Sequence, residues 1–206
     1  MFSKEFKEKN ISNEAFIEML YKTFMNRGSD EAGMAYWLKY LETGFDREYI
    51  FANFVASKEY TEICEKYGII RGEVSDNGVI LESLSMYHNQ NLLLSQYIAR
   101  CYDKIQEREF DAQGMEFWCG QIINKEQEAK AVAEFFVLSE EFVNKNKSDE
   151  EFIDILYNAF FGRQKDDAGN AFWLGVLGSG EKSREEVLKD FSASKEFAEI
   201  VESFGL

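Results

Sequence analysis

A repeated residue pattern constrains the fold of this chain more than any other feature. The spacing Tyr-x5-Arg-x2-Asp-x2-Gly-x3-Trp occurs three times with identical intervals, beginning at Tyr21, Tyr102 and Tyr157. Each copy then ends in Ser-x-Glu-aromatic, beginning at Ser57, Ser139 and Ser194. Agreement at so many fixed positions indicates three copies of one structural unit. Units of this size bury their apolar faces only by packing against their neighbours.

Each copy has the residue periodicity of short helices. The first helix of each copy carries apolar residues at helical spacing: Phe16, Ile17, Leu20, Tyr21 and Phe24; Leu93, Leu94, Tyr97, Ile98, Cys101, Tyr102 and Ile105; Phe152, Ile153, Leu156, Tyr157 and Phe160. An Asp then stands where the N-cap of a second helix belongs, and the serine of Ser-x-Glu is placed to cap a fourth. The chain contains no proline, which favours helices over a β-sandwich. The sequence therefore predicts an all-α fold of three tandem repeats of about four short helices each, packed into one compact or elongated array.

The spacing of the copies predicts the domain boundaries. Tyr102 and Tyr157 are 55 residues apart, whereas Tyr21 and Tyr102 are 81 apart. The additional residues include the turn-forming stretch GIIRGEVSDNG. We expect repeat 1 over 11–67, a connector over 68–90, repeat 2 over 91–145 and repeat 3 over 146–206.

Composition and charge restrict the classes of partner. Apolar residues make up 45% of the 206 residues, which is enough for a packed core. The net charge of −15 repels a phosphate backbone, so nucleic acid is excluded as an expected partner. No apolar run approaches the roughly 18–20 residues that a membrane span needs, and residues 1–10 lack the apolar core of a signal peptide. These features predict a soluble chain without membrane insertion.

Residues for metal binding or catalysis form no recognisable site in the sequence. Cys64, Cys101 and Cys119 have neither the even count nor the CxxC spacing of a disulfide or zinc framework, so we expect small buried thiols. Asp76 with Asn77, and Asp166 with Asp167, offer oxygen ligands without EF-hand spacing, and we interpret them as exposed helix starts. His88 is the only histidine, and the chain contains no GxSxG, GxxxxGK or HExxH motif. We expect no metal, no cofactor and no enzymatic activity.

Nine repeated side chains are the candidate ligand-binding residues: Arg27, Asp30 and Trp37; Arg108, Asp111 and Trp118; Arg163, Asp166 and Trp173. Each type has a structural role as an alternative. The Asp caps a helix, the Arg complements a helix dipole or pairs with the local Asp or the Ser-x-Glu carboxylate in a buried clamp, and the Trp fills a core. Together they also form the kind of small site that holds a hydroxyl-rich ligand, with the Trp as a stacking surface.

The motif FIEMLYKTFMNRGSDEAGMAYWLKYLETG…FVASKEY resembles a widespread bacterial helical repeat domain of unknown function, itself similar to the linker domain of phycobilisome rod proteins. Repeat 3 matches it with FIDILYNAFFGRQKDDAGNAFWLGVLGSG…FSASKEF. Repeat 2 departs from it most, in its loop EREFDAQG and over 121–127, where the usual helix end at glycine is missing. The resemblance implies an all-helical fold, no catalysis, and a place in a larger secreted or cell-surface bacterial protein beside carbohydrate-active or adhesive modules.

Two functions follow as hypotheses. The first is a lectin-type binding module for a glycan or surface polysaccharide, in which three weak sites act together by avidity. The second is an architectural spacer or protein-docking scaffold that has no small-molecule ligand and binds a protein partner through its variable surfaces. Exposure discriminates between them. An open pocket lined by unpaired Arg and Asp atoms favours the lectin, and mutually satisfied side chains favour the scaffold.

Overall fold

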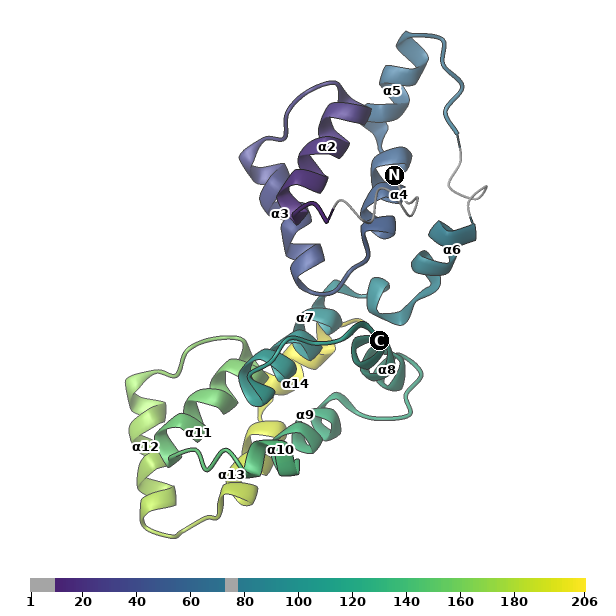
Figure 1. Cartoon of the computed structure of the whole chain (residues 1–206). Coiled ribbons are helices and arrows are strands. Elements are labelled where there is room, and N and C mark those ends of the chain that lie inside the picture. Colours follow the sequence, from purple (N-terminus) through teal and green to yellow (C-terminus); the bar gives the residue numbers. More distant parts are fainter. Residues whose placement is uncertain (1–9, 73–77) are drawn as a thin grey trace. The chain divides into compact units, whose positions relative to one another are not determined.

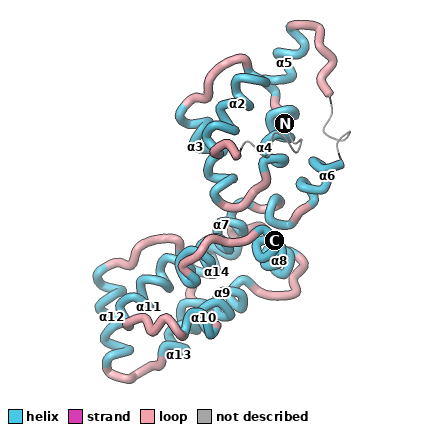
Figure 2. Tube along the Cα trace, viewed as in Figure 1, coloured by secondary structure: helices cyan, strands magenta, loops and turns pink. Residues whose placement is uncertain are grey.

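A computed structural model describes residues 10–72 and 78–206, and these residues form helices and loops without a strand (Figures 1 and 2). The chain divides into two compact units, Met1–Leu92 and Leu93–Leu206. The first contains repeat 1 and the predicted connector, and the second contains repeats 2 and 3. The predicted all-α fold of tandem helical repeats is confirmed.

In unit 1, repeat 1 forms four helices: α2 (Asn13–Met25), α3 (Glu31–Glu42), α4 (Arg47–Ala56) and α5 (Lys58–Lys66). Helix α2 contacts each of the other three, so it is the centre of the repeat. The buried side chains of Phe16, Ile17 and Leu20 on α2 pack with Ile50 and Phe54 on α4. The apolar spacing predicted for the first helix therefore marks the face that builds this core.

The stretch predicted as a connector is partly helical and belongs to unit 1. It contains α6 (Gly78–Ser85) and a short 3₁₀ turn, η2 (Tyr87–Asn89), and α6 contacts α4. The Asp46 carboxylate, at the N-terminus of α4, accepts hydrogen bonds from the Ser83 hydroxyl at 2.8 Å and the Asn89 amide at 2.9 Å, and lies 3.6 Å from His88 Nε2. These partly buried polar contacts attach the segment 83–89 to repeat 1. Asp76 and Asn77 lie outside the described residues.

In unit 2 the first helix of each repeat ends in a π-helical turn. Repeat 2 comprises α7 (Leu92–Arg100), η3 (Cys101–Gln106), α8 (Ala112–Ile123), α9 (Ala129–Leu138) and α10 (Glu140–Val143). Repeat 3 comprises α11 (Asp149–Leu156), η4 (Tyr157–Phe161), α12 (Asp167–Gly178), α13 (Arg184–Ser192) and α14 (Lys195–Glu202). Helices α11 and α13 begin with capping boxes, in which Ser148 and Ser183 pair with the Glu three residues later.

Repeats 2 and 3 pack through equivalent elements. The π-turns η3 and η4 contact each other, and so do the third helices α9 and α13. Like-on-like contacts of this kind are the pattern of an isologous pair, and they give the two repeats a common core. The buried rings of Tyr97, Phe160 and Phe197 belong to this core, with Tyr97 and Phe160 lying 5.8 and 5.0 Å from Phe197 between ring centres.

Two sequence expectations about burial have different outcomes. All three cysteines are free and buried, as predicted. Leu93, which the sequence placed on the apolar face of the first helix of repeat 2, is 44% exposed. Leu93 lies in the first turn of α7, and the buried residues of this helix begin at the next position, Leu94.

Candidate functional site

The repeated arginine joins three helices of its repeat. In repeat 1, Arg27 donates to both carboxylate oxygens of Glu59 on α5, at 2.7 and 3.0 Å, and to Asp30 before α3 at 3.2 Å. Its guanidinium lies 4.8 Å from the centre of the Tyr21 ring on α2. Bidentate pairing uses the fixed fork of the guanidinium, and the ring contact adds a cation–π attraction. We call this arrangement the arginine clamp.

Repeat 3 has the same arginine clamp. Arg163 donates to Glu196 at 2.6 and 2.9 Å and to Asp166 at 3.4 Å, and lies 4.9 Å from the Tyr157 ring. In each repeat the arginine follows a residue in the left-handed region, with φ of 51° at Asn26, 53° at Glu107 and 65° at Gly162. This sharp end of the first helix directs the arginine back over the tyrosine.

The arginine clamp of repeat 2 is looser. Arg108 makes a single hydrogen bond of 3.3 Å to Glu141 and lies 3.9 Å from Asp111. Its ring contact with Tyr102 is kept, at 4.8 Å. The departure of repeat 2 from the family pattern therefore coincides with weaker pairing around the same arginine.

The repeated aspartate caps the second helix in every repeat. Asp30, Asp111 and Asp166 each accept a hydrogen bond of 2.8 Å from the backbone amide of the glycine three residues later. This bond satisfies an amide at the helix start that would otherwise lack a partner, and the predicted N-caps are confirmed. The Gly33 amide, followed by Arg27, lowers the pKa of Asp30. Asp166 has a lowered pKa for the same reasons, through Gly169 and Arg163.

The repeated glycine lets the tyrosine hydroxyl approach the second helix. A Cβ atom added at Gly33, Gly114 or Gly169 would collide with the hydroxyl oxygen of the tyrosine in the same repeat. Burial raises the pKa of Tyr21, and a hydrogen bond with Trp37 opposes that rise. The Tyr, Gly and Trp positions of the motif are thus explained by one packing contact between the first two helices.

The repeated tryptophan packs between the second and third helices. Trp37, Trp118 and Trp173 lie 5.4, 5.5 and 5.3 Å from Phe54, Phe136 and Phe191 between ring centres. All three indoles are partly buried. This position matches the core role more closely than an open stacking surface.

The structure therefore brings the predicted Arg and Asp of each repeat together, with the Glu of Ser-x-Glu, and places the Trp further along the second helix. One expectation about them is wrong. The arginine clamp is not buried, because the Arg27, Arg108 and Arg163 side chains are 40%, 46% and 42% exposed. The short loop after the left-handed residue lies at the surface, so the guanidinium packs one face on the tyrosine and leaves the other in water. Three hollows in unit 2 are lined by other residues.

A second set of repeated residues was missed by the sequence interpretation. The residue before each tryptophan is an exposed aromatic ring: Tyr36 at 53%, Phe117 at 54% and Phe172 at 60% exposure. Each ring stands edge-on to its tryptophan at 4.9 Å between ring centres. The signal was present in the sequence as an aromatic–Trp pair in all three copies. We call these three side chains the exposed rings.

The described part of the chain has neither a metal-binding cluster nor a membrane-spanning helix. Residues 10–72 and 78–206 contain no cluster of three or more His, Cys, Asp or Glu side chains able to hold a metal ion. No helix in the same ranges is long and apolar enough to cross a membrane. The expected absence of a cofactor stays a prediction.

Comparison with known proteins gives a family and no individual relative. No curated protein and no solved structure matched the chain. A family described as a domain of unknown function, DUF4214, matches three times, over residues 1–64, 82–146 and 133–201. The likeness to the phycobilisome linker domain stays a prediction. Since these three matches cover most of the chain and coincide with the three clamp-bearing repeats, the chain belongs to the DUF4214 family.

Proposed function

We propose that this chain is a non-enzymatic architectural scaffold that docks a protein partner on its surface. The observation that supports this proposal is the state of the repeated polar atoms. Every Arg and Asp of the motif is engaged within its own repeat, by Glu, Asp, tyrosine ring or backbone amide. A ligand would have to compete with these internal bonds, and exposed carboxylates that already hold an Arg are poor free acceptors.

The scaffold proposal explains why the pattern is repeated without a change of spacing. The clamp fixes the end of the first helix to the start of the second and the fourth, so each repeat has the same internal geometry. Variable surface positions are then free to differ between repeats. By extension of the family resemblance, we propose that the scaffold is part of a larger secreted or cell-surface bacterial protein.

Carbohydrate binding is the second candidate, and the exposed rings favour it. Flat rings open to solvent suit the apolar face of a sugar, and three of them on one chain suit avidity. In this version the platform is Tyr36, Phe117 and Phe172, and the tryptophan beside each ring supports it. The arginine clamp holds the second helix, which carries the exposed ring, against the first helix and makes no contact with the sugar.

A glycan array with matched variants separates the two candidates. We expect the labelled wild-type chain to bind no glycan. The substitutions Arg27→Ala and Arg163→Ala should each lower the free energy of unfolding by about 1 kcal/mol, because the ion pairs that they remove are partly exposed. Binding to a defined sugar family that is lost in the variant Tyr36→Ala, Phe117→Ala, Phe172→Ala, at unchanged melting temperature, would overturn the scaffold proposal in favour of the lectin. Glycan binding lost with the Arg variants alone would support the pocket predicted from sequence.

A further inference from the structure

Repeat 2 carries an apolar surface that the other two repeats lack. On α9 and α10, Phe135, Leu138 and Val143 are 59%, 50% and 58% exposed. Counted from the serine of Ser-x-Glu, the equivalent residues are Asn53, Ala56 and Thr61 in repeat 1 and Asp190, Ala193 and Ala198 in repeat 3. Those residues are polar or small. The repeat fold therefore does not require large apolar side chains at these positions, and something else accounts for them.

The apolar residues form one continuous surface, which we call the strip. Phe135 and Leu138 are three residues apart on α9, so they share a face of the helix. Trp118 lies 5.1 Å from Phe135 and 4.9 Å from Phe117 between ring centres, which extends the strip onto α8. Exposed side chains that cluster in this way mark an interaction surface, whereas single ones need no explanation.

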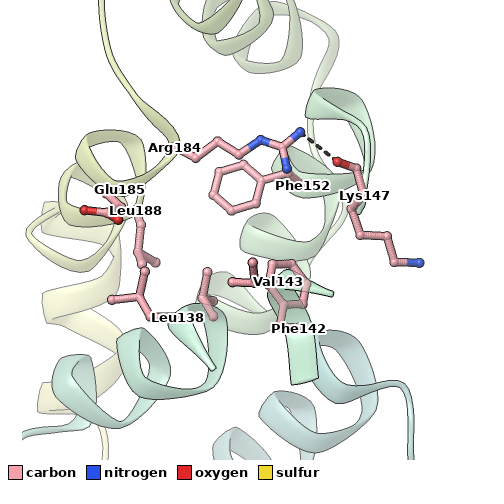
Figure 3. Close-up of a pocket in the computed structure, with 9 residues that line it drawn as sticks. Leu138, Phe142, Val143, Lys147, Phe152, Arg184, Glu185 and Leu188 are labelled. Atoms are coloured by element: carbon pink, nitrogen blue, oxygen red, sulfur yellow. Dashed lines mark hydrogen bonds between the residues drawn. The ribbon is translucent and has the colours of Figure 1, made fainter. Parts of the chain in front are cut away.

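The strip ends in a hollow between repeats 2 and 3 of about 200 Å³. Figure 3 shows Leu138, Val143 and Phe142 on one side of it and Phe152 on another. Its floor is apolar, because Phe142, Phe152 and Leu188 are buried side chains. A cavity of about 150 Å³ with an apolar lining holds one benzene molecule. The hollow is therefore large enough for one aromatic or branched aliphatic side chain.

At the hollow the cationic side chains have ion-pair partners and the carboxylates do not. Its two cations are engaged, with Lys147 at 2.6 Å from Glu107 and Arg184 at 2.6 Å from Asp149. Glu185 lines the hollow, and Glu140 is exposed on α10 three residues before Val143, which also lines it. Neither carboxylate has an ion pair with any residue of the described ranges 10–72 and 78–206. The net charge of −15 adds to this local excess of negative charge. A partner with basic residues beside its apolar anchor matches both features.

We infer that the strip and its hollow bind the apolar face of a basic amphipathic helix on a partner protein. The inference deepens the proposed scaffold function and rests on it. One apolar side chain of the partner helix occupies the hollow, its neighbours at helical spacing cover Leu138 and Phe135, and its Lys or Arg residues face Glu140 and Glu185. A helix suits the site because the described residues offer no sheet edge to which an extended peptide could add.

The test uses the residues of repeat 1 as the substitution. The triple variant Phe135→Asn, Leu138→Ala, Val143→Thr gives repeat 2 the surface with which repeat 1 folds, and it leaves every charge in place. The probes are two synthetic amphipathic peptides that share a Leu/Phe face and carry either Lys or Glu on the polar face. Binding is measured by fluorescence anisotropy against the full chain, with Phe172→Ala as a control that removes an exposed ring outside the strip.

We expect the Lys peptide to bind the wild type and the Phe172→Ala variant equally, and the triple variant at least tenfold more weakly. The Glu peptide should bind the wild type at least tenfold more weakly than the Lys peptide. Equal binding of the Lys peptide to wild type and triple variant would show attraction by net charge alone and would overturn the inference, as would a preference for the Glu peptide.

Two further measurements address other occupants of the strip. Sedimentation of a wild-type dimer that the triple variant abolishes would assign the strip to a second copy of this chain and overturn the inference. Co-sedimentation with phosphatidylcholine vesicles, lost in the triple variant, would assign it to a lipid surface with the same consequence. The glycan array reports on the scaffold function without using these peptides, so failure of the inference and failure of that function are distinguishable.

Discussion

At the scale of single residues, the most informative contact is the one between a tyrosine hydroxyl and a glycine. In repeat 3 the hydroxyl of Tyr157 lies against the position that a Cβ of Gly169 would occupy. The same helix contains Gly175, where an added Cβ meets nothing within 4 Å. The two glycines on this helix therefore differ: close packing against Tyr157 requires a glycine at 169, whereas no packing contact requires one at 175.

We expect Gly169→Ala to destabilise unit 2 by about 1–3 kcal/mol, because the new methyl group overpacks the contact with Tyr157. Gly175→Ala should stabilise the same unit by up to about 1 kcal/mol, since alanine is the better helix former. Thermal unfolding followed by circular dichroism measures both. The double variant Gly169→Ala, Tyr157→Phe lacks the hydroxyl and should recover part of the loss. If Gly169→Ala costs as much in the Tyr157→Phe background as in the wild type, the collision is contradicted.

At the scale of elements, the clamps determine how firmly the helix ends are joined, and they differ between repeats. Arg163 makes a bidentate pair with Glu196, whereas Arg108 has one bond of 3.3 Å to Glu141. Both arginines belong to unit 2, so their effects on stability are directly comparable. In the equivalent pair of repeat 1, the hydrogen bonds from Arg27 lower the pKa of Glu59.

The matched prediction is that Arg163→Ala lowers the stability of unit 2 by about 1 kcal/mol and Arg108→Ala by less than half of that, as expected for partly exposed pairs. For a unit of about this size, 1 kcal/mol corresponds to roughly 4–8 °C in melting temperature. Differential scanning calorimetry at low and high salt measures both variants. High salt should reduce the difference between them, and a larger effect at Arg108 would refute the ranking.

At the scale of the whole molecule, the chain has two compact units, each with its own core. Phe16 on α2 is fully buried in unit 1, and Leu156 on α11 is fully buried in unit 2. Truncating either side chain to alanine leaves a cavity inside one unit, at a cost of about 3–5 kcal/mol for Phe→Ala and about 2–5 kcal/mol for Leu→Ala.

We expect Phe16→Ala to increase amide hydrogen exchange in unit 1 and Leu156→Ala to increase it in unit 2, as measured by mass spectrometry of peptides from the two units. The reason is that the free energy of opening is set by the core in which the cavity lies. Exchange that rises equally over both units in either variant would show a single cooperative core and contradict this division.

The sequence by itself determined the repeat, the all-helical class, the aspartate caps and the free buried cysteines. These features depend on local spacing: a capping Asp bonds an amide three residues away, and a helix presents every third or fourth side chain to its core. Even the pairing of Arg with Glu was foreseeable, because both recur at fixed intervals. What spacing could not supply was the exposure of that pair, or of Tyr36 beside the packed Trp37.

Only the tertiary structure decided how the repeats combine. Three similar copies do not specify that repeats 2 and 3 share a core through like elements while repeat 1 packs with the segment 78–89. That choice depends on contacts between residues far apart in the chain. The strip on repeat 2 illustrates the same limit. In the sequence its residues appear as large apolar side chains at three positions where the other repeats have small or polar ones. Interpreting them as a binding surface depends on the hollow beside them, which is formed where α9, α10, α11 and α13 meet.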